Sequence, residues 1–159
     1  MKPHNEIHLE SLAAGELDEA YQLYRDCLSE FIDQAFGWHE AFQQQRFRSS
    51  YPIDSLRWLT DINSRRFGLV SFLEKDQSLH LSLLLLYQAH RGSGLGSLVM
   101  RELEGLAEAS GHKITLSTFR ENKGAVSFYQ KLGYQIDKQD EHFYEMSRGL
   151  MFLQPDARE

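Results

Sequence analysis

The sequence predicts an α/β (α+β) fold in which a mixed, mostly antiparallel central sheet of about six to seven strands carries helices on both faces. Three strand-like segments separated by turn residues lie between Ser55 and Tyr87. A glycine-rich stretch then opens a segment of helical period, and strands and helices alternate after it. Strand runs followed by a β-α-β-α-β pattern imply a mixed sheet with helices packed on it. No repeat or linker divides the chain, so we expect a single domain over residues 1–159.

The first predicted elements are a short strand and two helices. Weak alternation from Glu6 to Leu12 predicts the strand. Apolar residues recur at helical spacing from Leu17 to Ile32, which predicts a long amphipathic helix closed by Gly37. A weaker helical pattern begins at Trp38 and ends before Pro52.

An antiparallel meander and then alternating helices and strands complete the predicted fold. The meander strands are Ser55 to Thr60, Arg66 to Lys75 and Ser78 to Tyr87, joined by turn residues suited to hairpins. After the glycine-rich stretch, a helix with one apolar face runs to Ser110-Gly111. The remaining elements are a strand at Lys113 to Thr118, a helix at Lys123 to Leu132, and strands at Tyr134 to Asp137 and Glu141 to Met146.

The stretch from Gln88 to Ser97, QAHRGSGLGS, predicts a phosphate-binding loop. Gly92, Gly94 and Gly96 let the backbone turn sharply and approach a ligand closely. A loop that leads from a strand into a helix directs unpaired N–H groups and the positive end of the helix dipole at one spot. The P-loop lysine and the third glycine of the dinucleotide fingerprint are both missing, because Ser97 follows Gly96. The loop is therefore expected to bind another phosphate-bearing ligand.

Two motifs identify a resemblance to a known family. The first, Q/R-x-x-G-x-G/A, is met by Arg91, Gly94 and Gly96. The second, N-x-x-A-x-x-h-Y-x-K-x-G-aromatic, is met about thirty residues later by Asn122, Ala125, Phe128, Tyr129, Lys131, Gly133 and Tyr134. In this order and spacing, residues 65 to 147 resemble the GCN5-related N-acetyltransferase (GNAT) superfamily.

The resemblance implies an N-acetyltransferase that uses acetyl-CoA and no metal. The acetyl group would pass to a primary amine of a small molecule or peptide, by direct attack in a ternary complex. The cofactor contacts implied by the family are the backbone of Leu84 and Leu86, the loop residues Arg91, Gly92, Ser93, Gly94, Leu95, Gly96 and Ser97, and Asn122, Ala125, Phe128 and Lys131. The alternative is a non-catalytic acyl-CoA-binding regulatory module that keeps the loop without the chemistry.

Two residues are the candidate catalytic groups. Tyr129 matches the family tyrosine placed to protonate the departing CoA thiolate. His80 lies where several members carry a base on the strand before the loop, and an imidazole with a pKa of about 6.5 suits that role at neutral pH. Glu40, His39 or a water chain are the alternatives for the base. The other interpretation of His80 is an ordinary residue on the outer face of a strand.

The acceptor is expected to contact the predicted first two helices and their connection. In the family this region, here Phe31 to Arg48, selects the acceptor. Trp38, Glu40 and Phe42 are the candidate substrate-binding residues. The aromatic residues of this segment, Phe47 included, either line an acceptor pocket or belong to the core. The sequence does not identify the amine.

Composition restricts partners and location. A formal charge of −6 with scattered basic residues disfavours nucleic acid and mildly favours cationic acceptors. No apolar run is long enough for a leader or a membrane span, so we expect a cytoplasmic protein without membrane contact. The lone cysteine, Cys27, is expected to pack as a small hydrophobe. Met151 to Leu153 are expected either to cover a sheet edge or to contact a second subunit of a homodimer.

Overall fold

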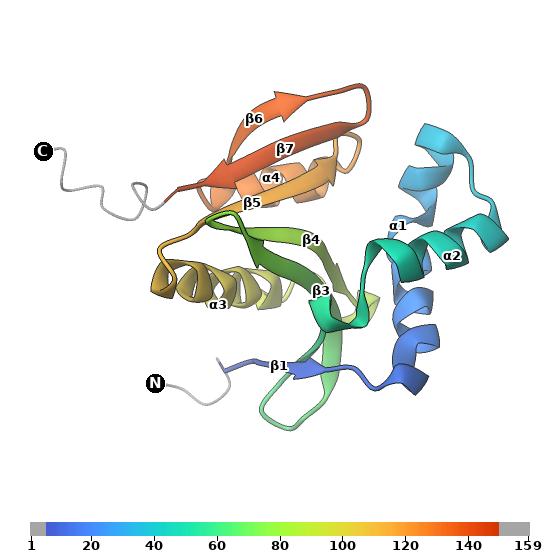
Figure 1. Cartoon of the computed structure of the whole chain (residues 1–159), viewed down its shortest axis with the longest axis horizontal. Helices are drawn as coiled ribbons and strands as arrows, with labels where there is room; N and C mark the ends of the chain where they lie inside the picture. Colours follow the sequence, from blue (N-terminus) through green and yellow to red (C-terminus); the bar gives the residue numbers. More distant parts are fainter. Residues whose placement is uncertain (1–5, 150–159) are drawn as a thin grey trace, which may run out of the picture. The chain divides into compact units, whose positions relative to one another are not determined.

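A seven-stranded mixed sheet organises the chain, in the order β1-β2-β3-β4-β5-β7-β6. The computed structural model describes residues 6–149 (Figure 1). The strands are β1 (His8–Ser11), β2 (Leu56–Thr60), β3 (Arg66–Lys75), β4 (Ser78–Leu86), β5 (Lys113–Phe119), β6 (Gln135–Gln139) and β7 (Phe143–Arg148). The helices are α1 (Leu17–Phe36), α2 (Glu40–Ser50), α3 (Leu95–Ala109) and α4 (Lys123–Lys131). This mostly antiparallel sheet with helices confirms the predicted fold class.

Local turn chemistry sets where several elements end. At Gly37 the backbone takes a φ of 84°, which ends α1 as the sequence predicts. A two-residue turn, Asp76-Gln77, joins β3 to β4 with both residues at positive φ. The carboxylate of Asp140 accepts the N–H groups of His142 and Phe143. That turn places the ends of β6 and β7 two residues later than the predicted strands.

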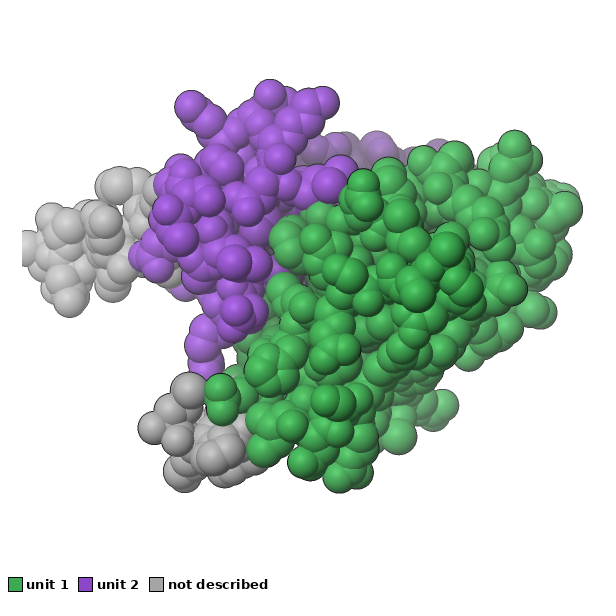
Figure 2. All heavy atoms as spheres, turned by 60° about the horizontal axis from the view of Figure 1, so that its bottom comes forward, with its two compact units in different colours: residues 1–72, 83–99 green, residues 73–82, 100–159 purple. Residues whose placement is uncertain are grey.

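The described residues form two compact units (Figure 2). Within the described range, the first comprises residues 6–72 and 83–99, and the second comprises residues 73–82 and 100–149. In the first unit, β1 and β3 pair antiparallel with β2. In the second, Ser78–Leu81 of β4 pair in parallel with Lys113–Leu116, and β7 pairs antiparallel with both β5 and β6.

An aromatic cluster holds α1 against α2 in the first unit. The rings of Tyr21, Tyr24, Phe47 and Tyr51 lie with neighbouring centroids 5.0–6.0 Å apart. Phe47 is 1% exposed, and the Tyr24 hydroxyl donates to Gln43 at 3.2 Å. The cluster fixes the helix pair that carries the predicted acceptor residues, and it assigns Phe47 to the core.

In the second unit, a half-buried ion pair links a helix to the sheet. Glu104 of α3 accepts from Arg148 of β7 at 2.6 Å and from the Tyr134 hydroxyl at 3.0 Å. Ile114, Leu116 and Met146, which are 1–2% exposed, line the core of this unit. In Figure 1, β5, β7 and β6 lie side by side, in agreement with their pairing.

None of the helices in the described range 6–149 is long and apolar enough to cross a membrane. The expectation for Met151 to Leu153, a sheet-edge cover or a subunit contact, falls outside the described residues.

Gly68 marks a close approach between β3 and the end of β4. A Cβ at this position would press against the Leu85 carbonyl oxygen, and would lie 2.9 Å from Leu86 Cδ2 and 3.1 Å from Leu59 Cδ1. Because backbone cannot move aside as a side chain can, we expect Gly68→Ala to lower the free energy of unfolding by about 1–3 kcal/mol. Urea denaturation measures this loss.

Gly105 is the matched control for this substitution. It lies in α3 with nothing within 4 Å of a Cβ. Gly105→Ala is expected to raise the free energy of unfolding by about 0.5–1 kcal/mol, because alanine restricts the unfolded chain. Equal stability of Gly68→Ala and the parent protein would contradict the close approach.

Candidate functional site

The glycine loop has the backbone conformation that its sequence predicts. Gly92 and Gly94 take φ values of 72° and 86°, in the left-handed region that favours glycine. Helix α3 begins directly afterwards at Leu95, and the Leu98 N–H bonds to the Gly94 carbonyl at 3.3 Å. The N–H groups of the first turn therefore come before the first helical hydrogen bond and point out of the N-terminus of the helix. With open space around both glycines, the loop offers donors suited to an anion.

A short 3₁₀ turn, Gln88–His90, connects β4 to the glycine loop. The His90 N–H donates to the Tyr87 carbonyl at 2.9 Å, and the Ser93 hydroxyl donates to the His90 carbonyl at 2.6 Å. The hydroxyl of Ser93 therefore holds the loop to the preceding turn. This leaves the main chain of Ser93 as its predicted contribution to ligand binding.

Arg91 contacts the end of β4 and helix α1. Its Nε donates to the Leu86 carbonyl at 3.2 Å, and its Nη2 donates to the Cys27 sulfur at 3.2 Å. Burial raises the pKa of the Cys27 thiol, and the neighbouring guanidinium opposes that rise. Cys27 is half-buried, as a packed residue should be, and it also accepts a hydrogen bond that the sequence does not predict.

The leucine-rich strand β4 has one buried face and one more open face. Leu79, Leu81, Leu83 and Leu85 are 0–5% exposed. Leu84 and Leu86, the predicted backbone contacts for the cofactor, are half-buried. From residue 83 to residue 86 the sequence hides this alternation, because both faces of the strand carry leucine there.

His80 lies on the more open face of β4 and pairs with β5. Its Nδ1 lies 2.7 Å from the Thr115 hydroxyl. Thr115 is the residue opposite His80 in the parallel pairing of β4 and β5. Burial lowers the pKa of His80, and the Glu145 carboxylate opposes part of this shift. The imidazole is therefore neutral at pH 7, the state that a proton acceptor needs.

Tyr129 lies in α4 and is 7% exposed. Its ring packs edge-on against those of Phe128 and Tyr134, with centroids 5.1 and 5.8 Å away. Burial raises the pKa of the phenol and is the sole cause of that rise within the described chain. The hydroxyl therefore keeps its proton at neutral pH.

The other residues of the second motif build helix α4 around Tyr129. The Asn122 side chain caps the helix by accepting the Ala125 N–H at 3.2 Å. Phe128 is half-buried, and Lys131 is exposed in the last turn. The capping role of Asn122 is the one that its position before a helix predicts.

Glu40 anchors the start of α2. Its carboxylate accepts from the Tyr21 hydroxyl at 2.6 Å, the Trp38 indole at 3.0 Å and the Gln44 amide at 3.0 Å, and lies 3.6 Å from Arg25. These hydrogen bonds, Tyr21 first, lower the pKa of Glu40 to about 2. So weak a base does not accept a proton from an ammonium, which argues against Glu40 as the alternative general base.

Trp38 and Phe42 differ in their surroundings. The Trp38 side chain is half-buried and fixed by Glu40, and its backbone N–H donates to Asp33 at 3.0 Å. Phe42 is 57% exposed, as is Phe36 at the end of α1. The connection between α1 and α2 therefore presents a fixed indole and exposed phenyl rings.

The predicted site residues divide between the two units. The first unit contains Trp38, Glu40, Phe42, Leu84, Leu86 and the loop from Arg91 to Ser97, and the second contains His80, Asn122, Ala125, Phe128, Tyr129 and Lys131. Sequence reasoning missed the partners Tyr21, Cys27 and Thr115. Each lies at least 19 residues from the residue it contacts, so no local pattern reports it. Across the described residues, no three His, Cys, Asp or Glu side chains are grouped to hold a metal ion.

Comparison with known proteins identifies the class. The sequence model of the Acetyltransferase (GNAT) family matches residues 17–134 of this chain. That match covers most of the chain and includes the glycine loop and the α4 motif. The chain belongs to the GNAT acetyltransferase family.

Sequence identity to individual relatives is low. N-alpha-acetyltransferase MAK3 of Arabidopsis thaliana is 32% identical over 66 residues, 41% of this chain and about a third (35%) of the plant protein. The uncharacterized protein YxbD of Bacillus subtilis is 26% identical over 117 residues, 74% of this chain and 72% of YxbD. The crystal structure of PaiA N-acetyltransferase from Thermoplasma acidophilum with coenzyme A has the same fold, with a TM-score of 0.70 and 17% identity over 91% of this chain and 99% of PaiA.

Proposed function

We propose that this protein is an acetyl-CoA-dependent N-acetyltransferase that acetylates a primary amine of a small molecule or peptide. The observation that carries the proposal is the glycine loop, with Gly92 and Gly94 in the left-handed region and α3 starting directly after them. Backbone N–H groups at a helix N-terminus bind phosphate without a basic side chain. Residues 92–96 would bind the pyrophosphate, with the main chain of Leu84 and Leu86 along the pantetheine arm. PaiA, which has this fold, was crystallised with coenzyme A.

Direct attack by the amine is the mechanism that the side chains support best. Acetyl-CoA supplies the acetyl group as a reactive thioester. A covalent acyl-enzyme would need an activated nucleophile. The chain's lone cysteine, Cys27, has a raised pKa and its sulfur accepts from Arg91, so its thiol stays protonated. A ternary complex therefore fits this chain better than an acyl-cysteine.

Tyr129 and His80 are the proposed acid and base. The Tyr129 phenol keeps its proton at neutral pH, so it can donate a hydrogen bond or a proton to the leaving thiolate. The neutral His80 imidazole can accept the proton of the ammonium, directly or through water. The hydrogen bond to Thr115 restrains the orientation of its ring.

The acceptor is proposed to contact the connection between α1 and α2. Trp38 presents an indole that Glu40 holds in place, and Phe42 presents an exposed ring. In this interpretation Glu40 orients Trp38 and contributes negative charge near the amine. Aromatic faces attract ammonium groups, which suits a cationic acceptor.

Replacement of Tyr129 by Phe tests the proposed chemistry. The ring is buried and its packing is preserved, so stability and the Kd for CoA should change little. Turnover should fall roughly 10²-fold because the proton donor is lost. CoA release from acetyl-CoA, measured with a panel of amines, polyamines, amino acids and peptides, reports both activity and acceptor.

Tyr144→Phe is the matched control. Tyr144 lies in the same unit, and the Arg120 guanidinium carbon lies over the Tyr144 ring, 5.3 Å from the ring centroid. Its turnover should equal that of the parent. Equal turnover of Tyr129→Phe and the parent with a good acceptor would make Tyr129 a structural residue. CoA binding without release for every amine would favour the non-catalytic module.

The pH dependence of kcat/KM tests His80. Because burial lowers the pKa of His80, the base form predominates above that pKa, and kcat/KM should rise through an apparent pKa below about 6.5 and then level off. His80→Gln should remove this limb and leave CoA binding intact. A limb that moves with the basicity of the acceptor and survives His80→Gln would assign deprotonation to water.

A further inference from the structure

Helix α1 contacts the segment that leads into the glycine loop at two separate points. Glu19 Oε2 accepts from the Tyr87 hydroxyl at 3.0 Å, and the Cys27 sulfur accepts from Arg91 Nη2 at 3.2 Å. Glu19 and Cys27 are two turns apart on α1, with the buried Leu23 midway between them. Tyr87 and Arg91 bracket the 3₁₀ turn Gln88–His90, so both ends of that turn are tied to one helix.

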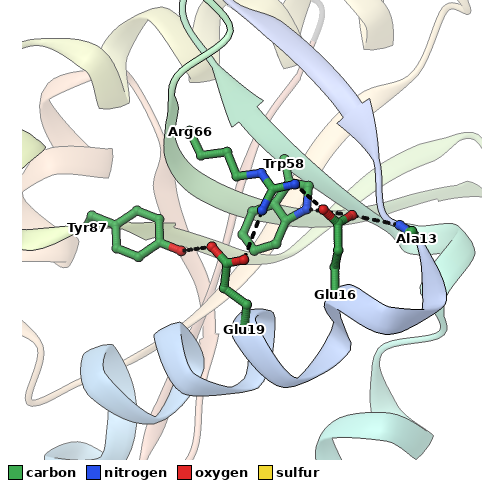
Figure 3. Close-up of polar contacts among 6 residues, drawn as sticks. All are labelled: Ala13, Glu16, Glu19, Trp58, Arg66 and Tyr87. Carbon is green, nitrogen blue, oxygen red and sulfur yellow. Dashed lines mark hydrogen bonds and ion pairs between the residues drawn. The ribbon is translucent and has the colours of Figure 1, made fainter.

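The Glu19 contact belongs to a larger network between α1 and β3 (Figure 3). Arg66 of β3 donates to Glu19 at 2.9 Å and pairs with Glu16, and its guanidinium lies 4.3 Å from the centroid of the Trp58 ring. Glu16 also accepts from the Trp58 indole at 3.2 Å and from the Ala13 N–H at 2.8 Å. The arginine thus restrains both carboxylates, and Glu19 faces Tyr87 in one orientation.

Tyr87 is fixed through its backbone as well as its side chain. Its N–H donates to the Phe67 carbonyl of β3 at 3.0 Å. Burial, followed by the hydrogen bond to Glu19, raises the pKa of Tyr87 to about 12. The phenol therefore remains a hydrogen-bond donor to Glu19 across the physiological range.

We propose that α1 positions the glycine loop through two contacts, Glu19 with Tyr87 and Cys27 with Arg91, so that contacts on the segment before residues 92–96 help to set CoA affinity. The inference rests on the proposed function, since it concerns the same loop. A loop with two left-handed glycines has many conformations to lose when a ligand binds its N–H groups. Restraining the segment before it reduces that ordering cost in advance. Glu19, Tyr87 and Cys27 are positioning residues in this scheme. Arg91 links the segment before the loop to α1 and to the Leu86 carbonyl.

The test is the Kd for CoA, measured by calorimetry on the parent and on single variants. Tyr87→Phe removes one hydroxyl and keeps the ring, and should weaken CoA binding about threefold to tenfold. Cys27→Ala should weaken it similarly, and Cys27→Ser should recover part of the loss because a hydroxyl oxygen also accepts from Arg91. In steady-state assays the KM for acetyl-CoA should rise while kcat at saturation stays the same.

Asp18 provides the matched control. It lies next to Glu19 on α1, but its carboxylate bonds Arg48 of α2 at 3.0 Å. Asp18→Asn and Glu19→Gln remove the same charge from the same helix turn, and only Glu19→Gln should weaken CoA binding. Thermal denaturation of all variants separates affinity from stability, since Kd is measured well below each Tm.

The outcomes separate this inference from the function on which it rests. A parent protein that does not bind CoA would contradict the proposed function. A parent protein that binds CoA, together with parental Kd values for Tyr87→Phe, Glu19→Gln and Cys27→Ala, would overturn the positioning role alone. Equal weakening by Asp18→Asn and Glu19→Gln would also overturn it, because the effect would then follow helix charge.

Discussion

The left-handed backbone at Gly92 and Gly94 is the constraint on which the rest of the functional interpretation depends. It turns the chain from the end of β4 into the first turn of α3 within a few residues. A residue with a Cβ rarely adopts this φ, so the turn and the exposed N–H groups follow from the same two glycines. Every role proposed for Leu84, Tyr129 or His80 assumes that the phosphates of CoA bind there.

Helix α1 contacts both the segment before this loop and helix α2, which carries part of the proposed acceptor site. One set of its side chains contacts α2, through Tyr21 with Glu40 and Tyr24 with Gln43. Another set, Glu19 and Cys27, contacts the segment before the loop. The helix that packs against α2, next to the proposed acceptor residues, is therefore also the helix that we propose restrains the glycine loop.

The sequence predicted the elements well because their signals are local. Gly37 ends α1, the glycine loop opens α3, and Asn122 caps α4, each within a few residues of the boundary that it sets. The shift in β6 and β7 depends on the Asp140 side chain, which the alternation of apolar residues does not report.

The site was harder to predict where it depends on contacts distant in sequence. Glu40 was a candidate base by residue type, but three hydrogen-bond donors lower its pKa to about 2, and Tyr21 lies 19 residues away. The contact of Arg91 with Cys27 spans 64 residues. Residue type predicts which groups can act as acid, base or ligand, and the folded contacts decide which of them keep the required pKa and orientation.

Calorimetric titration of CoA into the parent protein and into Gly94→Val tests the central claim most directly. A valine at a φ of 86° strains the loop, and its side chain occupies the open space in which the pyrophosphate would bind. The proposed function predicts that the parent binds CoA and that Gly94→Val, still folded by circular dichroism, binds it at least about 10²-fold more weakly, a loss of several kcal/mol. Equal CoA affinity of the two proteins would contradict the assignment of the glycine loop as the cofactor site.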